Sequence, residues 1–327
     1  MSWVFLYPGQ GSQKAGMGAD FYEEFPEYRL FLDALPAPFD LKGMMHEGTE
    51  EQLARTEYTQ PCMAALAAGI THLLAGACVV PAAAAGLSLG EYCALYAGGC
   101  FTPDELLTVT SFRGRAMAEA AEGLSCCMSA VIGPDSDAVD AACRQASRPH
   151  TGFVAAANYN CPGQTVICGD ERAVEEAEAI LKAQKAVRTV RLKVSGPFHT
   201  PFMKPAAEKL EGLFRSLGPF VPAEPKIPVT ANATGGFYPA AAEISGLLTR
   251  QVQESVRLEQ NLRALLTAGY RDFLEIGPGN TMRGFLKKTA RAMGIPVRAE
   301  GIGTAAEFRD FLQRGNGIPV PAEGQEA

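Results

Sequence analysis

The sequence has no long run of apolar residues and no recognisable leader segment. No uninterrupted apolar stretch approaches the about 20 residues that a membrane-spanning helix requires. Met1 to Gly11 leads directly into a short apolar run and a glycine-rich motif, without the charged start, long apolar stretch and cleavage site of a secretory signal. These absences argue against a membrane protein and predict a cytoplasmic one.

Cysteine is frequent, with nine residues, but the paired spacing of metal sites and disulfide frameworks is missing. No two cysteines form a C-x-x-C pattern, and an odd number cannot pair completely. Neither a metal site nor a disulfide framework is therefore expected. We expect mostly buried free thiols in a reducing compartment, at positions 62, 78, 93, 100, 126, 127, 143, 161 and 168.

The chain is also short of positive charge, with a formal net charge of −7 and a pI near 5.3. Because phosphate binding needs a clustered positive surface, nucleic acid is not an expected partner. A bound dinucleotide is only weakly indicated, since Gly9-Gln10-Gly11 follows an apolar run but lacks the third glycine of the fingerprint. The hydrophobic fraction of 47% and the charged fraction of 20% are those of a globular enzyme.

The most informative stretch is Gly86-Leu87-Ser88-Leu89-Gly90, a G-x-S-x-G pattern. Small apolar residues precede it, as in a buried strand, and residues 91–97 suit a helix. This context is typical of a nucleophile elbow, in which a sharp turn between strand and helix lifts a serine hydroxyl into a pocket. Positive φ at the serine leaves no room for Cβ atoms on its neighbours, which would explain both glycines. The same pattern also occurs by chance in ordinary turns, so context must decide.

A serine nucleophile needs a general base, and the chain has four histidines to supply one. His46, His72 and His150 lie in a polar loop, on an alanine-rich helix and beside Arg148-Pro149, with no special neighbours. His199 lies in Gly196-Pro197-Phe198-His199-Thr200-Pro201, an extended loop that follows a predicted strand. By elimination His199 is the predicted base for Ser88, although a satisfied turn histidine is the alternative.

The order of predicted elements indicates an α/β fold with an insertion. Strands over 2–7, 226–231 and 272–276, with helices between them, predict an α/β-hydrolase-like domain with a parallel sheet, formed by residues 1–122 and 195–310. Thr49 and Thr102 begin helices with capping boxes, and Thr59-Gln60-Pro61 is expected to open another.

Residues 123–194 alternate between strand and helix patterns in the order βαββαβ, which predicts an inserted ferredoxin-like subdomain. The strands are expected over 127–133, 153–157, 164–169 and 187–194, with helices over 135–147 and 171–184. Residues 318–327 are rich in Pro, Gly and Glu and are expected to be disordered.

Six motifs in order resemble one family, the malonyl-CoA:acyl-carrier-protein transacylases. They span residues 5 to about 290, almost the whole chain. Their residues are Tyr7–Gln13 with Gly16-Met17-Gly18, Gly86–Tyr92, Phe112-Arg113-Gly114, Asn158–Gln164, Pro197-Phe198-His199 and Glu275–Gly279.

The resemblance implies ping-pong transfer of a malonyl group from malonyl-CoA to the phosphopantetheine thiol of acyl carrier protein, which supplies fatty-acid synthesis. Ser88 would carry the malonyl group and His199 would act as base and then acid. The backbone N–H groups of Gln10 and Leu89 would stabilise the oxyanion, and the backbone carbonyl of Gln251 would orient the histidine. No permanently bound cofactor and no oligomer are implied.

The resemblance also assigns residues to the substrate and to the carrier protein. Arg113 would pair with the malonyl carboxylate, and Phe198 favours a small acyl unit. Asn160 and Gln164 would line the cleft, unless they only hold a turn in place. Two basic clusters would steer the acidic carrier protein, unless they are merely solvated faces. Their residues are Lys182, Lys185, Arg188, Arg191 and Lys193, and Arg283, Lys287, Lys288 and Arg291.

Two departures from the family pattern stand out, and they leave alternatives open. Leu87 occupies a position where many members have histidine, and Cys126-Cys127 replaces small residues. A trans-acting acyltransferase or an acyl hydrolase serving a polyketide synthase would keep the same motifs. A non-enzymatic scaffold is disfavoured because Ser88, His199, Gln10 and Arg113 are all present.

Overall fold

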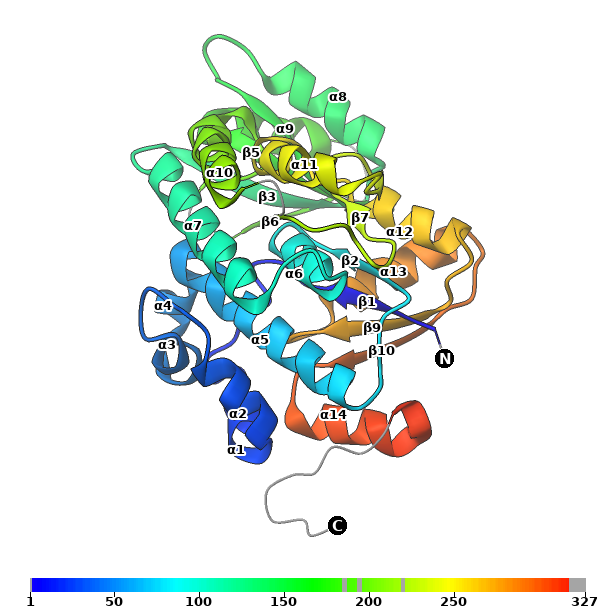
Figure 1. Ribbon diagram of the computed structural model, residues 1–327. Coiled ribbons are helices and arrows are strands. Elements are labelled where there is room, and N and C mark those ends of the chain that lie inside the picture. The colour runs from blue at the N-terminus through cyan, green and yellow to red at the C-terminus, as the bar shows by residue number, and fades with distance from the viewer. Residues whose placement is uncertain (1, 184–186, 193–195, 219–220, 318–327) are drawn as a thin grey trace.

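The computed structural model describes residues 2–183, 187–192, 196–218 and 221–317. These residues form an α/β structure with a parallel sheet and a separate antiparallel sheet, which lie toward opposite ends of the view in Figure 1. The tail 318–327, Lys185, Lys193 and the predicted boundary at 194/195 lie outside the described residues.

The larger unit is built on a four-stranded parallel sheet with the strand order β10-β9-β1-β2. The central strand β1 is buried throughout because helices cover both faces of the sheet. Alternate β1 side chains enter different apolar clusters: Trp3, Phe5 and Tyr7 enter one, and Val4 and Leu6 enter the other. The strands are β1 (Trp3–Tyr7), β2 (Ala83–Gly86), β9 (Asp272–Ile276) and β10 (Arg298–Ile302).

The helices within residues 19–121 pack against the first of these clusters, together with the later helices over 204–217, 241–253 and 305–311, whereas those over 258–267 and 281–292 pack against the second. The first group is α1 (Ala19–Glu24), α2 (Pro26–Asp33), α3 (Leu41–Glu47), α4 (Glu50–Ala54), α5 (Thr56–Gly76), α6 (Leu89–Ala97) and α7 (Pro103–Ala121). The later helices are α10 (Lys204–Leu217), α11 (Ala241–Gln253), α12 (Leu258–Thr267), α13 (Thr281–Ala292) and α14 (Ala305–Phe311). Short elements are η1 (Pro201–Met203), η2 (Leu312–Asn316) and the hairpin of β7 (Thr230–Ala231) and β8 (Gly236–Phe237).

The smaller sheet is antiparallel and has the strand order β4-β5-β3-β6. Helices α8 and α9 pack on one of its faces around Val131 and Ile167. The other face presents Met128, Ala130 and Val166 toward the larger unit. The elements are β3 (Cys126–Ile132), α8 (Ser136–Ala146), β4 (Val154–Cys161), β5 (Gln164–Asp170), α9 (Glu171–Lys182) and β6 (Arg188–Arg191).

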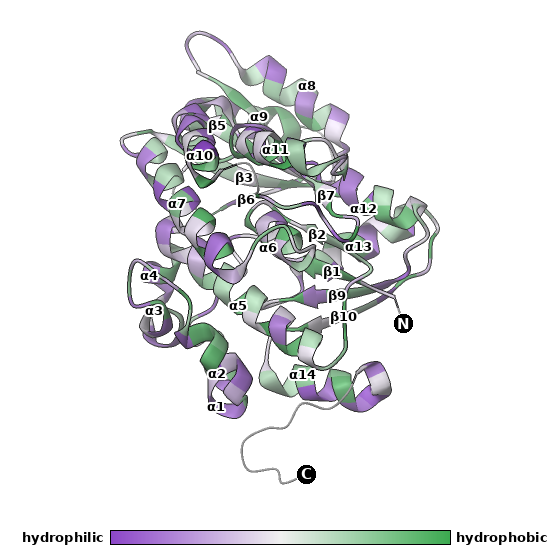
Figure 2. Ribbon diagram, in the orientation of Figure 1, coloured by the Kyte–Doolittle hydropathy of each residue, from purple (hydrophilic) through white to green (hydrophobic). Residues whose placement is uncertain are grey.

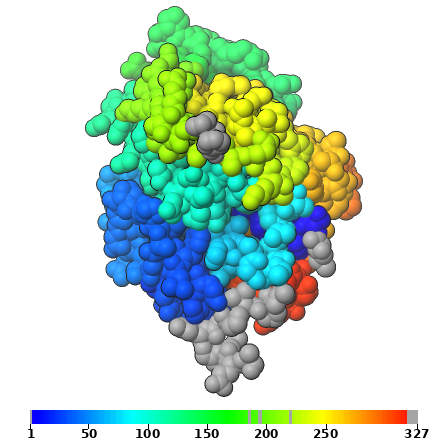
Figure 3. Space-filling view, in the orientation of Figure 1, coloured from blue at the N-terminus to red at the C-terminus, as the bar shows by residue number. Residues whose placement is uncertain are grey.

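The smaller sheet meets the larger unit along β4, which contacts α12 and α13 and forms a parallel bridge from Asn158 to Val256. Figure 2 shows apolar colouring concentrated on the central strands and on the inner faces of the helices. Figure 3 shows the segments of the smaller sheet at one end of the molecule and the N-terminal helices at the other. A cavity between the sheets therefore draws its walls from both units.

Both predicted capping boxes are present: Thr49 with Gln52, and Thr102 with Glu105. The expected helix opening at Thr59-Gln60-Pro61 is wrong, because α5 begins at Thr56 and Pro61 lies inside it. The N–H groups of Tyr58 and Thr59 already bond to the Arg55 carbonyl, which closes the first turn before the proline is reached.

The predicted strand over 226–231 is confirmed only at Thr230–Ala231, with one bridge from Val229 to Ala84. Pro228 has no N–H to give to a ladder, which shortens the strand. The predicted strand over 153–157 is observed as β4, which begins at Val154 and continues to Cys161, and of the described residues 187–192 of the expected strand over 187–194, β6 covers Arg188–Arg191. The elements α3, α11, α12, α14, β8, β10, η1 and η2 carried no prediction, and His46, expected in a loop, lies instead in α3.

Within the described ranges no helix is long and apolar enough to cross a membrane, and no cluster of three or more His, Cys, Asp or Glu side chains could hold a metal ion. Each of the nine cysteines is a free thiol. Six are buried, Cys126 and Cys127 are half-buried, and Cys78 is exposed.

Candidate active site

Ser88 lies in a strained turn between β2 and α6, as the motif predicts. Its φ of 52° is positive, a conformation that costs a non-glycine residue on the order of 1–3 kcal/mol. The glycines allow the close approaches that this turn needs. A Cβ on Gly86 would lie 1.9 Å from the backbone carbon of Gly90, and a Cβ on Gly90 would lie 2.1 Å from the Tyr7 carbonyl oxygen. The elbow therefore depends on both glycines.

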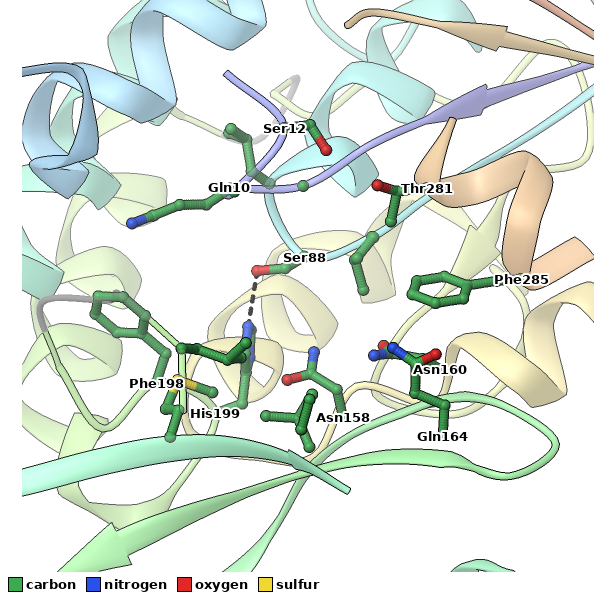
Figure 4. Close-up of a pocket in the computed structure, with 18 of the residues that line it drawn as sticks. Gln10, Ser12, Ser88, Asn158, Asn160, Gln164, Phe198, His199, Thr281 and Phe285 are labelled. Carbon is green, nitrogen blue, oxygen red and sulfur yellow. Dashed lines mark hydrogen bonds between the residues drawn. The ribbon is translucent and has the colours of Figure 1, made fainter. Parts of the chain in front are cut away.

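His199 faces the serine from the loop that precedes η1, also at a positive φ of 61°. Its Nε2 atom is 2.7 Å from Ser88 Oγ (Figure 4). Its Nδ1 atom is 2.7 Å from the carbonyl oxygen of Gln251. A carbonyl can only accept, so Nδ1 carries the proton and Nε2 is free to accept from the serine hydroxyl. This arrangement suits a general base without a carboxylate partner.

Burial lowers the pKa of His199 to about 3, and the charge of Arg113 acts in the same direction against the hydrogen bond to Gln251. We expect the imidazole to stay neutral well below pH 6.5, because the charged form is the disfavoured one. The stability that it contributes is present above pH 6.5 and is lost as the pH falls from 6.5 toward 3, since the unfolded chain takes up the proton first. Histidine NMR titration should find the His199 ring resonances unchanged from pH 8 to pH 5, and a midpoint near 6.5 would contradict this.

Arg113 reaches the same serine from α7 and is only 2% exposed. Its Nη2 atom donates to Ser88 Oγ at 3.1 Å and to Gln251 Oε1 at 2.9 Å. Its Nη1 atom donates to Gln60 Oε1 at 2.7 Å. The guanidinium also lies 5.2 Å from the ring centroid of Tyr92. Each of these hydrogen-bond partners is neutral.

A buried guanidinium stays charged and is normally paired with an anion. Within the part of the chain that the structure describes, no carboxylate forms an ion pair with Arg113. The site therefore presents a fixed positive charge about 3 Å from a candidate nucleophile, which favours a substrate with its own anionic group.

A cavity of about 230 Å³ opens above Ser88 and His199. Its walls come from the first loop (Gly9–Ser12), the elbow, α7, α13 and the inner face of the smaller sheet. Figure 4 shows Asn158, Asn160 and Gln164 on the side of the smaller sheet, and Thr281 and Phe285 beside them from α13. The lining is mostly apolar with a few convergent polar groups, as in small-molecule sites.

The family model described as "Acyl transferase domain" matches residues 4–313. A malonyl CoA-acyl carrier protein transacylase of Bacillus subtilis is 34% identical over 292 residues, which cover 89% of this chain and 91% of that protein. The chain belongs to the acyl transferase family, among the malonyl-CoA:acyl-carrier-protein transacylases. The resemblance stated from the six motifs is thereby confirmed.

Solved structures of this family superpose on the chain closely. A transacylase of Streptococcus pneumoniae described as MCAT has a TM-score of 0.87 and 34% identity, covering 96% of this chain and 100% of that one. A malonyl-transacylase in complex with a type II polyketide-synthase acyl carrier protein has a TM-score of 0.86 and 30% identity, with the same coverages. These likenesses support the α/β fold with its parallel and antiparallel sheets.

The structure brings together most of the residues that the family resemblance predicts for the chemistry. Ser88, His199, Arg113 and Gln251 form one hydrogen-bonded group. Leu89 is the first residue of α6, where backbone N–H groups have no partner within the helix. Gln10 lines the cavity, while its side-chain oxygen accepts from Thr56 Oγ1 at 2.7 Å on α5.

The residues predicted to line the cleft also lie there. Phe198, Asn160 and Gln164 all line the cavity. The Asn160 side chain is nearly buried, and its Oδ1 atom has no hydrogen-bond partner in the described part of the chain. This oxygen could accept a hydrogen bond from a ligand.

The predicted docking residues differ in their distance from the cavity and in whether they are already paired. Lys288 follows Phe285 by one helical turn on α13, and its Nζ atom lies 3.5 Å from Gln164 Oε1 at the cavity. Lys287 is exposed beside it. Arg191 is already paired with Glu178 at 2.8 Å and also contacts Cys127. Arg188 is exposed at the start of β6, and Lys193 lies outside the described residues.

Sequence reasoning missed several buried polar residues that support this site. Gln60 anchors Arg113 from α5, and Asn232 Oδ1 accepts from the Ser88 N–H at 2.7 Å. Glu91, although it directly follows the elbow motif, was not recognised as a buried acid. Its charge inside an otherwise apolar helix start was the available signal, whereas Asn232 is too distant in sequence to have given one.

The two departures from the family pattern occupy different places. Leu87 lines the cavity and packs against the second apolar cluster, next to Gly9. It therefore adds apolar surface at the elbow where many members have an imidazole. Cys126 and Cys127 begin β3, and nothing in the structure explains this pair.

Proposed function

We propose that this protein transfers a malonyl group from malonyl-CoA to the phosphopantetheine thiol of acyl carrier protein, through a malonyl ester on Ser88. One observation carries the proposal. A serine hydroxyl 2.7 Å from a buried neutral imidazole is also 3.1 Å from an arginine that pairs with no carboxylate among the residues the structure describes. The first contact supplies nucleophilic catalysis, and the second supplies a place for the free malonyl carboxylate.

The first half-reaction uses His199 as the base. Ser88 Oγ attacks the thioester carbonyl while its proton passes to His199 Nε2, and the Gln251 carbonyl stabilises the resulting imidazolium through Nδ1–H. The backbone N–H groups of Leu89 and Gln10 face the developing oxyanion. The C–S bond then breaks, His199 returns the proton to the CoA sulfur, and malonyl-serine remains.

The second half-reaction is the reverse with a different thiol. The phosphopantetheine thiol gives its proton to His199 and attacks the malonyl ester, and Ser88 leaves as the hydroxyl with the proton from the imidazole. Arg113 holds the malonyl carboxylate through both halves, with Gln251 and Gln60 fixing the direction of its N–H groups. Asn160 and Gln164 bind the polar part of the thioester arm, and Phe198 limits the acyl group to a small unit.

The proposal also covers the roles of the two units, the location of the reaction, the oligomeric state and the cofactor requirement. The larger unit, residues 1–122 and 195–310, acts as an α/β-hydrolase-like catalytic domain, and residues 123–194 form an inserted ferredoxin-like subdomain. We place the reaction in the cytoplasm, in fatty-acid synthesis, with a monomer as the working form and malonyl-CoA as donor. No resident cofactor is needed, because proton transfer and a fixed positive charge suffice for both half-reactions.

Mass spectrometry of the intact protein tests this function. Incubation with malonyl-CoA should add one malonyl group, which peptide mapping should place on Ser88. Addition of holo acyl carrier protein should then move the group to the carrier. A Ser88 adduct that disappears into water, with no malonyl carrier formed, would identify an acyl hydrolase instead. The absence of any adduct would contradict enzymatic function of this site.

Carrier docking is proposed at the rim formed by α13, where Lys287 and Lys288 are exposed beside the cavity. We expect Lys288→Glu to raise the KM for carrier protein about tenfold at low salt, with less effect at high salt, because rim charges act by steering. Arg314→Glu, on η2 away from the cavity lining, is the matched control and should leave KM unchanged. Equal KM values for both variants would count against docking at α13.

A further inference from the structure

We propose that Glu91, buried beneath the elbow, is a positioning residue that holds Ser88 and Arg113 together through the side chain of Gln251 and the backbone of Asn232. This inference rests on the proposed function, in which Arg113 binds the malonyl carboxylate. Glu91 lies on the first turn of α6, three residues after the nucleophile, and is 1% exposed. It does not line the cavity, so it acts through its neighbours.

Every described hydrogen-bond partner of the Glu91 carboxylate is a donor. Gln251 Nε2 donates to Oε2 at 2.8 Å, and the Asn232 backbone N–H donates to Oε1 at 3.1 Å. The Tyr238 hydroxyl also donates to Oε1. Burial raises the pKa of Glu91 to about 7, while these three donors and the charge of Arg113 oppose the rise. The three hydrogen-bond donors and the charge of Arg113 thus favour the carboxylate, whereas burial favours the carboxylic acid.

Two of these donors belong to residues that grip the Ser88 backbone from both sides. Asn232 Oδ1 accepts from the Ser88 N–H at 2.7 Å, and Asn232 Nδ2 donates to the Gly86 carbonyl at 2.8 Å. Gln251 Nε2 donates to the Ser88 carbonyl at 2.7 Å. Since Ser88 is held at a positive φ, these bonds keep its hydroxyl aimed at His199. Glu91 holds the Gln251 side-chain amide and the Asn232 backbone, and so supports both residues that contact the elbow.

The same amide connects Glu91 to Arg113. Gln251 Oε1 accepts from Arg113 Nη2 at 2.9 Å, while its Nε2 donates to the Glu91 carboxylate. The negative carboxylate thus sets which end of the amide faces the guanidinium. Arg113 is in this way directed toward Ser88. The buried Glu91 carboxylate balances its charge but contacts it only through Gln251, so among the described residues no carboxylate occupies the Arg113 N–H groups.

Replacing Glu91 with glutamine breaks this arrangement without changing its shape. One oxygen becomes an NH₂ group, which must face either the Gln251 amide N–H or the Asn232 N–H. Either orientation sets donor against donor. If the Gln251 amide turns over to relieve the first clash, its NH₂ group then faces Arg113. The disturbance therefore reaches the residue that selects the malonyl carboxylate.

The test measures rates of Ser88 acylation by malonyl-CoA and by acetyl-CoA in full-length variants. We expect Glu91→Gln to lower both rates, because the elbow loosens, and to lower the malonyl-to-acetyl ratio by a further factor of about ten, the size expected for coupled neighbours. In the Arg113→Met background Glu91→Gln should produce no further fall in this ratio. Glu105→Gln, which removes a half-buried charge from the start of α7 while keeping a residue suited to the capping box, should match the wild type.

The outcomes separate this inference from the proposed function. If Arg113→Met leaves the malonyl-to-acetyl ratio intact, the proposed role of Arg113 is wrong. If Arg113→Met lowers the ratio but Glu91→Gln lowers both rates equally, Glu91 is only structural and this inference is overturned. Should Glu91→Gln fail to fold, Gln251→Met interrupts the connection while keeping both charges and the Gln251 carbonyl, and it must lower the ratio for the inference to stand.

Discussion

Ser88→Ala is expected to form no malonyl adduct and to lose at least about 10⁴-fold in transfer rate, because the attacking oxygen is removed altogether. The hydroxyl takes part in two hydrogen bonds, which it donates to His199 and accepts from Arg113. The other hydrogen bonds of the site do not involve it. The variant should therefore fold and still bind malonyl-CoA. Intact-mass spectrometry measures the adduct, and a stopped assay with holo carrier protein measures the transfer.

His199→Ala should give a loss of similar size, since serine and histidine act as one unit and their effects do not add. The double variant should then be little worse than either single one. Ser216→Ala, an exposed serine on α10, is the control for loss of a hydroxyl and should retain full activity. A malonyl adduct that persists in Ser88→Ala would mean that another residue carries the acyl group.

Arg113→Met is expected to slow acylation by malonyl-CoA about 100-fold, the cost of losing a charge-assisted, bidentate contact to a carboxylate. Acylation by acetyl-CoA should be unchanged or faster, because methionine leaves an apolar site of similar length. The sign of the difference between the two substrates, rather than the absolute rate, identifies the role of Arg113. Parallel assays with both thioesters measure it.

The control for this prediction is on the same helix. Arg115 is exposed two positions further along α7, so Arg115→Met should leave both rates unchanged. Arg113→Met also leaves the acceptors on Gln60 and Gln251 without a donor, so a lower melting temperature is expected. Equal losses for malonyl and acetyl transfer would show that this instability, and not carboxylate binding, explains the effect.

The chemistry of the site was predictable where local sequence determines local geometry. The elbow was predicted from Gly86, Ser88 and Gly90 alone, although only the close approach at Gly86 is local and that at Gly90 is to the distant Tyr7 carbonyl oxygen. Alternating strand and helix patterns likewise predicted the elements of the smaller sheet. In contrast, the apolar run over 226–231 predicted a strand that forms only at Thr230–Ala231, because Pro228 has no N–H to give to a ladder.

The supporting residues could not be predicted, because they meet only in the folded chain. Asn232 lies 144 positions from Ser88, and no local pattern marks it as the acceptor for the Ser88 N–H. The family resemblance gave Gln251 a role for its backbone carbonyl alone, whereas its side chain also contacts Arg113, Glu91 and Ser88. Buried polar networks of this kind depend on which distant segments are packed together.

Ser88 and His199 both occupy left-handed backbone conformations, at φ values of 52° and 61°. Glycine would adopt either conformation at a lower cost in free energy. Favourable interactions elsewhere in the fold must therefore offset the backbone strain at these two residues. Selection for thermal stability alone would remove both side chains. Their presence marks the place where this chain gives up stability for reactivity, and a thermostabilised variant should therefore be sought through substitutions elsewhere.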